Sequence, residues 1–194
     1  MILKQVQNDI IAIMKKFLLP LLFLLFSQAF SQSSDIAAFT SEMQKQEGIF
    51  NYYYDEAVGR MFLEVDKLDK EFLYVNSLAA GIGSNDIGLD RGQLAGERVV
   101  KFEKHGNTLL LIQPNYDYRA VSENQDEVRS VAEAFASSVI GGFEIKTKSA
   151  NAYLIDITDW LLRDSHDVSG RLRGTDQGSF SVDKSRSALY MKAT

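Results

Sequence analysis

Alternating apolar and polar positions dominate the chain from residue 49 onward, which is the pattern of β-strands exposed on one face. Two pairs of such runs, residues 49–65 and 97–113, are each joined by a short turn that contains a glycine, so each pair predicts a β-hairpin. A further strand is expected from Glu71, and another pair over 143–149 and 152–158. The pattern therefore predicts about six to eight antiparallel strands.

One long amphipathic helix is predicted at about 123–139, because apolar residues recur there at helical spacing from Val128 to Val139. Ser122 and Gln125 fit a capping box, and the glycine pair at 141–142 would end the helix. The predicted fold class is α+β and β-rich: antiparallel sheets and hairpins with this helix packed on them.

Shorter elements are expected near both ends. Residues 32–48 predict a short N-terminal helix or linker. The stretch "TDWLLRD" predicts one helical turn capped by Thr158, with Trp160 packed beneath it, and residues 170–191 predict loop and a further strand.

The first 31 residues have the pattern of a leader preceded by a mis-assigned start. Residues 1–13 would precede the true initiator, Met14, and residues 14–31 would form a signal-peptide helix. Two lysines precede a ten-residue apolar run, and Ser31 and Gln32 flank the predicted cleavage site. The run is too short to span a bilayer, so we expect an exported chain with no stable membrane anchor after cleavage, in the periplasm or at the cell exterior.

The composition narrows the classes of partner and of site that the chain can have. The chain carries 26 acidic and 21 basic residues, a net charge of −5, which disfavours nucleic acid as a partner. It has no cysteine, so a disulfide framework and a thiolate zinc site are excluded.

A glycine-rich loop lies within "SLAAGIGSNDIGLDRGQLAGERVV", residues 77–100, which holds five of the 13 glycines. Asp86 stands where a dinucleotide fingerprint needs its third glycine, and the phosphate-loop Gly-Lys-Ser/Thr is absent. Asn85, Asp86 and Asp90 could supply oxygen ligands to calcium, although the EF-hand spacing is missing. No cofactor is predicted for this chain, and calcium binding at this loop is left as an open alternative.

No catalytic or metal-binding set is predicted. The two histidines are His105, in a predicted hairpin turn, and His166, which lies between Asp164 and Asp167. The chain has neither His-Glu-x-x-His nor Gly-x-Ser-x-Gly. A small hydrolase that uses His166 is a weaker alternative.

Several blocks, in this order, carry a family resemblance: "KQEGIFNYYYDEAVGRMFLEV", the loop sequence above, "LLLIQPNYDYRA", "VAEAFASSVIGGFEI", "LIDITDWLLRDSHDV" and "DKSRSALYM". Together they resemble the N-terminal region of large exported bacterial zinc-dependent metalloproteases of the metzincin-like type. In that family the region is a domain of unknown function ahead of the peptidase. The resemblance implies that residues 49–194 are a single β-rich domain, incomplete at its C-terminus, and that zinc belongs to a peptidase domain outside this chain.

Two functions follow as expectations. The first is a non-catalytic accessory domain, present as a fragment, that packs against or assists the peptidase domain of its parent protein. Its docking surface would be the loop side chains Asn85, Asp86, Asp90, Arg91 and Gln93. The alternative is a stand-alone exported module that binds a peptide or glycan through the Gly81–Gly96 loop.

Overall fold

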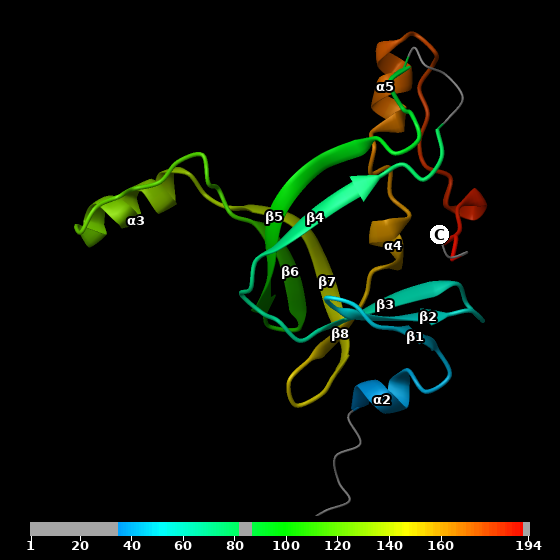
Figure 1. Cartoon of the computed structure of the whole chain (residues 1–194), viewed down its shortest axis with the longest axis horizontal. Helices are drawn as coiled ribbons and strands as arrows, with labels where there is room; N and C mark the ends of the chain where they lie inside the picture. The colour runs from blue at the N-terminus through cyan, green and yellow to red at the C-terminus, as the bar shows by residue number, and fades with distance from the viewer. Residues whose placement is uncertain (1–34, 82–86, 192–194) are drawn as a thin grey trace, which may run out of the picture.

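A computed structural model describes residues 35–81 and 87–191, and its main feature is one curled antiparallel sheet of eight strands (Figure 1). The strands are β1 (Gln44–Gln46), β2 (Asn51–Asp55), β3 (Arg60–Val65), β4 (Phe72–Ser77), β5 (Leu94–His105), β6 (Thr108–Gln113), β7 (Ser138–Lys148) and β8 (Tyr153–Asp156). The prediction of a β-rich, antiparallel fold with six to eight strands is confirmed for this part of the chain.

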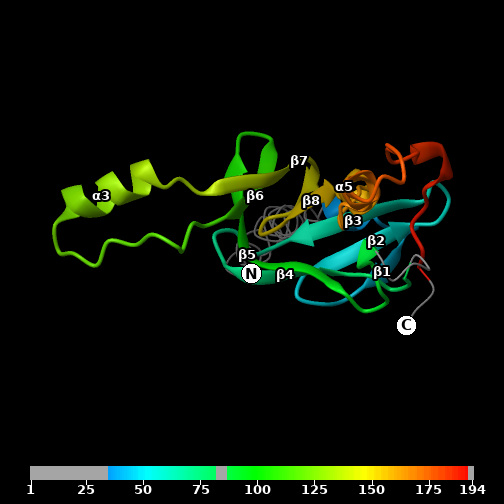
Figure 2. The same cartoon turned by 90° about the horizontal axis from the view of Figure 1, so that it is seen from above.

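The order of the strands across the sheet is β1-β2-β3-β8-β7-β6-β5-β4. The first three strands build one side, and the chain then crosses to the opposite edge to form β4. Strands β5 to β8 return inward as an antiparallel meander, so that β8, the last strand along the chain, pairs with β3 in the interior of the sheet (Figure 2).

Both predicted hairpins form. Gly59 turns the chain between β2 and β3 with φ of 67°, and Gly106 turns it between β5 and β6 with φ of 59°. Side chains other than Gly, Asn and Asp rarely adopt this left-handed conformation, which explains a glycine at each turn.

The hydrophobic core lies on the inner face of the curl. Its members alternate along their strands, as a half-buried sheet requires. They are Val65, Val100, Phe102, Leu109, Leu111, Phe143, Ile145 and Ile155. A second, smaller cluster lies on the other face, where Ile36 of α2 (Asp35–Phe39) packs with Phe62 and Leu154. Leu154 and Ile155 are both 0% exposed, so β8 is covered on both faces.

The long helix predicted at 123–139 is shorter than expected and does not pack on the sheet. Helix α3 spans Gln125–Ala134, has no buried residue, and lies on an arm that projects far from the sheet (Figures 1 and 2). Its N-cap is Asn124, whose side chain accepts a hydrogen bond from the Asp126 amide, so the predicted Ser122–Gln125 capping box is wrong. The C-terminal end of the predicted stripe is strand, because Val139 pairs with Ile112 of β6.

The short elements also differ from the predictions. Helix α2 ends at Phe39, and Gln44–Gln46 pairs with β2 instead of continuing the helix to residue 48. Helix α4 (Thr158–Leu161) begins at Thr158, but Ile157 is its N-cap; the Thr158 hydroxyl instead accepts a hydrogen bond from the Met61 amide at 2.9 Å.

Residues 170–191 form no strand. They contain most of helix α5 (Val168–Gly174) and the short 3₁₀ helix η2 (Lys184–Arg186). The predicted leader, 1–31, lies outside the described residues. None of the helices within residues 35–81 and 87–191 is long and apolar enough to cross a bilayer.

Candidate functional site

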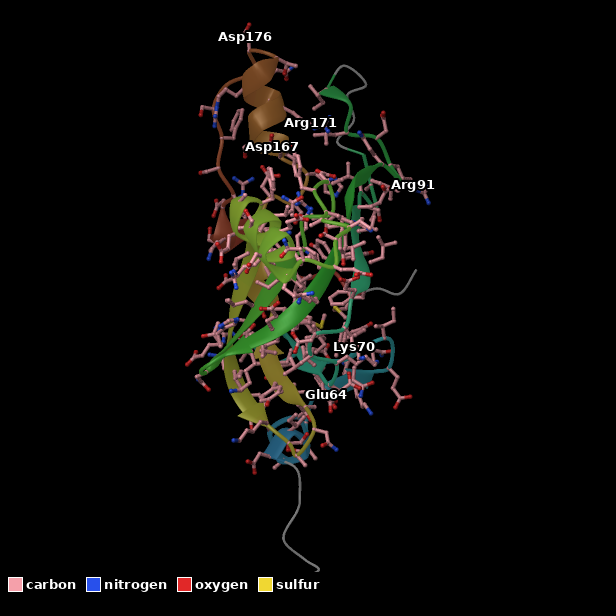
Figure 3. All side chains as sticks on the ribbon, turned by 90° about the vertical axis from the view of Figure 1, so that its left-hand side faces the viewer. Glu64, Lys70, Arg91, Asp167, Arg171 and Asp176 are labelled. Atoms are coloured by element: carbon pink, nitrogen blue, oxygen red, sulfur yellow. The ribbon has the colours of Figure 1, made fainter. Side chains whose placement is uncertain are left out.

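The glycine-rich loop is held by its own chain at the described positions. Ile87 and Leu89 are buried, at 6% and 1% exposed. Nη1 of Arg171, on α5, donates hydrogen bonds to the carbonyls of Ile87 at 3.1 Å and Gly88 at 2.9 Å. Figure 3 shows Arg171 on α5, beside this loop. The loop and α5 therefore form one end of the molecule together.

The glycines of this loop shape its backbone. Gly88, Gly92 and Gly96 have φ of 62°, 83° and 74°. At Gly81 the reason is close approach, since a Cβ there would lie 3.2 Å from the Arg91 nitrogen and 3.3 Å from the Leu89 carbonyl oxygen. The interpretation of these glycines as determinants of loop shape is supported at these four positions.

The predicted docking residues are only partly within the described chain. Asn85 and Asp86 lie outside it. The Asp90 amide donates to Gln93 Oε1 at 3.2 Å and the Gln93 amide donates to the Asp90 carbonyl at 3.2 Å, which closes a turn. Asp90 and Arg91 are exposed, and Figure 3 shows Arg91 pointing away from the sheet. The structure therefore brings Asp90, Arg91 and Gln93 together on one exposed turn.

His166 is half-buried in a hollow of about 400 Å³ between the end of β4 and the segment that joins α4 to α5. Both neighbouring aspartates have other hydrogen-bond partners. Asp164 accepts from the amides of Val168 at 2.8 Å and Ser169 at 2.9 Å, and Asp167 accepts from the Gly170 amide. Burial alone would raise the pKa of Asp164, but these amide donors hold it below its ordinary value. No hydrogen bond joins His166 to either aspartate, so the geometry of a His–Asp catalytic pair is not formed.

A second hollow, of about 480 Å³, lies where α4 meets β7 and β8. Trp160 and Phe143 contribute aromatic faces to it, with ring centroids 5.6 Å apart in an edge-to-face arrangement. Gly141 leaves room for the indole, because a Cβ there would lie 2.9 Å from Trp160 Cζ3. Gly141, one of the two glycines expected to end a helix, instead lets a tryptophan lie against the strand.

Arg163 borders both hollows. The carbon of its guanidinium lies 3.0 Å from the centroid of the Trp160 ring, and its Nη2 donates to Tyr74 Oη at 3.0 Å. Tyr74 Oη in turn donates to Asn76 Oδ1 at 2.7 Å, which fixes the direction of both hydrogen bonds. Burial lowers the pKa of Arg163, the Tyr74 hydroxyl partly offsets this, and the positive charge of Arg98 lowers it further.

The carboxylates around the Trp160 hollow already have cationic partners. They pair as Asp156 with Arg60 at 2.9 Å, Glu144 with Lys146 at 2.6 Å, and Asp159 with Lys184 at 2.9 Å. Among the described side chains, no carboxylate lies within ion-pair distance of Arg163. The hollow therefore contains a half-buried guanidinium that its surroundings do not neutralise.

Sequence reasoning missed this cluster. The available signal was the spacing of Trp160 and Arg163 within the predicted helical turn, since residues three apart on a helix lie on one face; the observed helix ends at Leu161, before Arg163. Tyr74 comes from a distant strand, and only the topology brings it to them. Within residues 35–81 and 87–191, no group of three or more His, Asp or Glu side chains is arranged to hold a metal ion.

Comparison with known families divides the chain into two matched stretches. Residues 34–81 match a domain of unknown function, DUF5118, and residues 92–194 match another, DUF5117. No curated protein and no solved structure matches the chain. The first stretch supplies β1 to β4 and the second supplies β5 to β8, so both contribute to one sheet. Since the second match covers more than half of its residues, the chain belongs to the DUF5117 family of domains of unknown function.

Proposed function

We propose that this chain is the non-catalytic N-terminal part of an exported bacterial zinc-dependent metalloprotease of the metzincin-like type, and that it packs against the peptidase domain. The ordered sequence blocks described above support this assignment. In this proposal the zinc ion and the catalytic residues belong to the peptidase domain, and the present chain contributes a packing surface.

The observation that carries the packing role is the projecting α3 arm, residues 114–137, none of whose helical residues is buried. Val121 is 99% exposed and Phe135 is 40% exposed, although Phe135 stacks on Tyr118 with ring centroids 3.9 Å apart. A ten-residue helix is marginally stable alone in water, and its stability normally comes from packing of its apolar face. Within the described residues the cover is partial: Val128 and Val131 are half-buried and no residue of α3 is buried, so a second surface is expected to complete it.

The polar side of α3 does not need a partner. Arg129 lies 2.6 Å from an Asp126 oxygen and 4.0 Å from a Glu133 oxygen, so its charge is balanced along the helix itself. The apolar positions Val128 and Val131 lie one helical turn apart, as a docking stripe requires. This half-covered apolar stripe, rather than the charged side, is therefore the surface proposed to meet the peptidase domain.

The exposed turn with Asp90, Arg91 and Gln93 is the second proposed contact. Its backbone is fixed by the hydrogen bonds from the Gln93 amide to the Asp90 carbonyl and from the Gly92 amide to the Leu78 carbonyl, so these side chains can meet a partner with little further loss of backbone entropy. Asn85 and Asp86 are included in the same proposed surface because they are neighbours in the sequence; they lie outside the described residues.

Hydrogen exchange provides a direct test. The coding DNA downstream of this chain would first be sequenced to find a segment that encodes His-Glu-x-x-His. The present chain would then be compared with a longer polypeptide in which that peptidase domain follows it. We expect the amides of residues 125–135 to exchange more slowly in the longer polypeptide. The substitution Val131→Asp should abolish that protection, whereas Glu133→Gln, on the polar side, should leave it unchanged. Equal exchange of the arm in both polypeptides would refute the packing role.

A further inference from the structure

Arg163 has the geometry of an anion receptor. A guanidinium has five N–H donors in a planar fork, and here only the bond to Tyr74 Oη uses one of them within the described residues. Stacking on Trp160 and the Tyr74–Asn76 hydrogen bond hold the fork in one orientation before any ligand arrives. A fixed and half-buried fork loses less freedom on binding than a solvated arginine does.

A second cation lies close by. Arg98 on β5 is directly opposite Tyr74 on β4, so both side chains are on the same face of this strand pair. Its Nη1 donates to Gln113 Oε1 at 2.7 Å, and no carboxylate in the described part of the chain pairs with it. Both arginines lie beside Tyr74, and neither is paired with a carboxylate from residues 35–81 or 87–191.

Two like charges close together are unfavourable unless an anion lies near them. The carboxylates of the Trp160 hollow do not serve this role, because each is already paired with another cation. Six of the nine lining residues are charged, and Trp160 and Phe143 add aromatic surface beside the guanidinium. These rings can pack on an apolar part of a ligand while the unpaired guanidinium binds its charged group.

We propose that the Arg163–Trp160 hollow is a binding site for a carboxylate group carried on a small apolar stem, with Arg163 as the bidentate donor and Arg98, which lies outside the lining of this hollow, as a more distant positive charge. Planar carboxylates match the guanidinium fork, and this pairing is among the stronger hydrogen-bonded contacts in proteins. The volume of about 480 Å³ suits a small organic acid or one acidic residue of a peptide. This site does not depend on the proposed metalloprotease assignment.

The only tryptophan of the chain lies in the site, so its fluorescence reports on occupancy. The full chain would be titrated at constant ionic strength with N-acetylglutamate, with its neutral analogue N-acetylglutamine amide, with an acidic tripeptide, and with sodium sulfate. We expect a saturable fluorescence change with the carboxylates and none with the neutral amide or with sulfate. Tighter binding of the tripeptide than of N-acetylglutamate would identify a peptide as the source of the carboxylate, and the reverse order would identify a free acid.

Variants assign the response to the fork. Arg163→Gln should abolish binding, and Arg163→Lys should weaken it by at least about tenfold because the bidentate geometry is lost. Tyr74→Phe keeps the aromatic ring but removes the hydroxyl that orients the Arg163 guanidinium, so it should weaken binding several-fold. This variant tests the proposal if the Arg163 variants fold poorly. Arg129→Gln, on the α3 arm, is the matched control and should bind normally. The proposal is overturned by no saturable response up to about 10 mM, by an equal response to sulfate, or by normal binding in Arg163→Gln.

Discussion

Leu63 on β3 lies directly opposite Ile155 on β8, and this pair joins the two stretches of the chain that match different families. The same connection occurs at the far edge, where Phe72 of β4 lies opposite Val100 of β5. The strands of the first stretch therefore flank those of the second on both sides. Two family matches here correspond to one continuous sheet.

Truncating a side chain at this junction should destabilise both stretches together. Ile155 is fully buried, so Ile155→Ala is expected to lower the free energy of unfolding by about 2–5 kcal/mol. Trp160 fluorescence and far-UV circular dichroism should report the same midpoint in urea. Leu73→Ala, at a side chain that is 64% exposed, should change stability by less than about 0.5 kcal/mol. Two separate transitions would show that the stretches fold independently.

Residues 34–81 produced alone should not form a cooperative unit. Without the second stretch, β3 loses its partner β8 and keeps only β2, and β4 loses β5, so one edge of β3 and β4 itself are left unpaired. We expect no sigmoidal thermal transition for this segment. Its amides should also exchange freely, whereas the same amides are protected in the full chain. A sharp transition in the isolated segment would contradict the shared sheet.

Gly141→Ala should displace the indole of Trp160. The new Cβ would lie 2.9 Å from Trp160 Cζ3 and 3.2 Å from the Phe143 ring, and overpacking of this kind costs about 1–3 kcal/mol. The fluorescence spectrum should shift at the same time. The control is Gly174→Ala, where a Cβ meets nothing within 4 Å, and stability should stay equal or rise slightly. Equal behaviour of both variants would argue against the role of Gly141 as a contact surface.

Arg171→Ala should release the glycine-rich loop from α5 without unfolding the sheet. Two hydrogen bonds to loop carbonyls are lost, each worth about 0.5–1.5 kcal/mol. The Gly92 amide, which donates to the Leu78 carbonyl at 2.7 Å, is expected to exchange faster, while amides of β6 and β7 stay unaffected. Arg173→Ala, on the same helix, is the comparison variant and should leave the exchange of the loop unchanged.

Tyr53 should make stability fall at high pH. Burial and the hydrogen bond from its hydroxyl to Glu64, at 2.7 Å, raise the pKa of Tyr53 from 10.0 to about 12. Because the folded pKa lies above the unfolded value, the stabilisation is complete below pH 10 and is lost as pH rises through 12. The loss is on the order of 2 kcal/mol. Absorbance at 295 nm should show a late-titrating tyrosine that is absent in Tyr53→Phe; identical titration curves for the two proteins would contradict this.

The hairpins were predictable because their signals are local. Gly59 and Gly106 lie between alternating runs, and each turn is decided by a few neighbouring residues. The helix predicted at 123–139 forms only over Gln125–Ala134, and its C-terminal end was mispredicted for the opposite reason. Val139 fits the apolar stripe of the predicted helix. In the structure it pairs instead with Ile112 of β6, and the spacing of apolar residues along the sequence does not reveal which distant strand lies beside it.

The candidate sites show the same division. The shape-determining glycines of the loop could be inferred from composition, whereas its anchor, Arg171, comes from the opposite end of the chain. The Arg163 hollow was invisible because its parts come from β4, β7 and α4. Each residue alone resembles an ordinary core or surface residue.

The pairing of β3 with β8 has a kinetic consequence. Residues close in sequence form the β2–β3 hairpin early, but the strand that covers its open edge ends at Asp156. Folding rates fall as the sequence distance between contacting residues grows, so closure of this edge should be the slow phase of refolding. During synthesis from the N-terminus, the hairpin that leaves the ribosome first is therefore completed last.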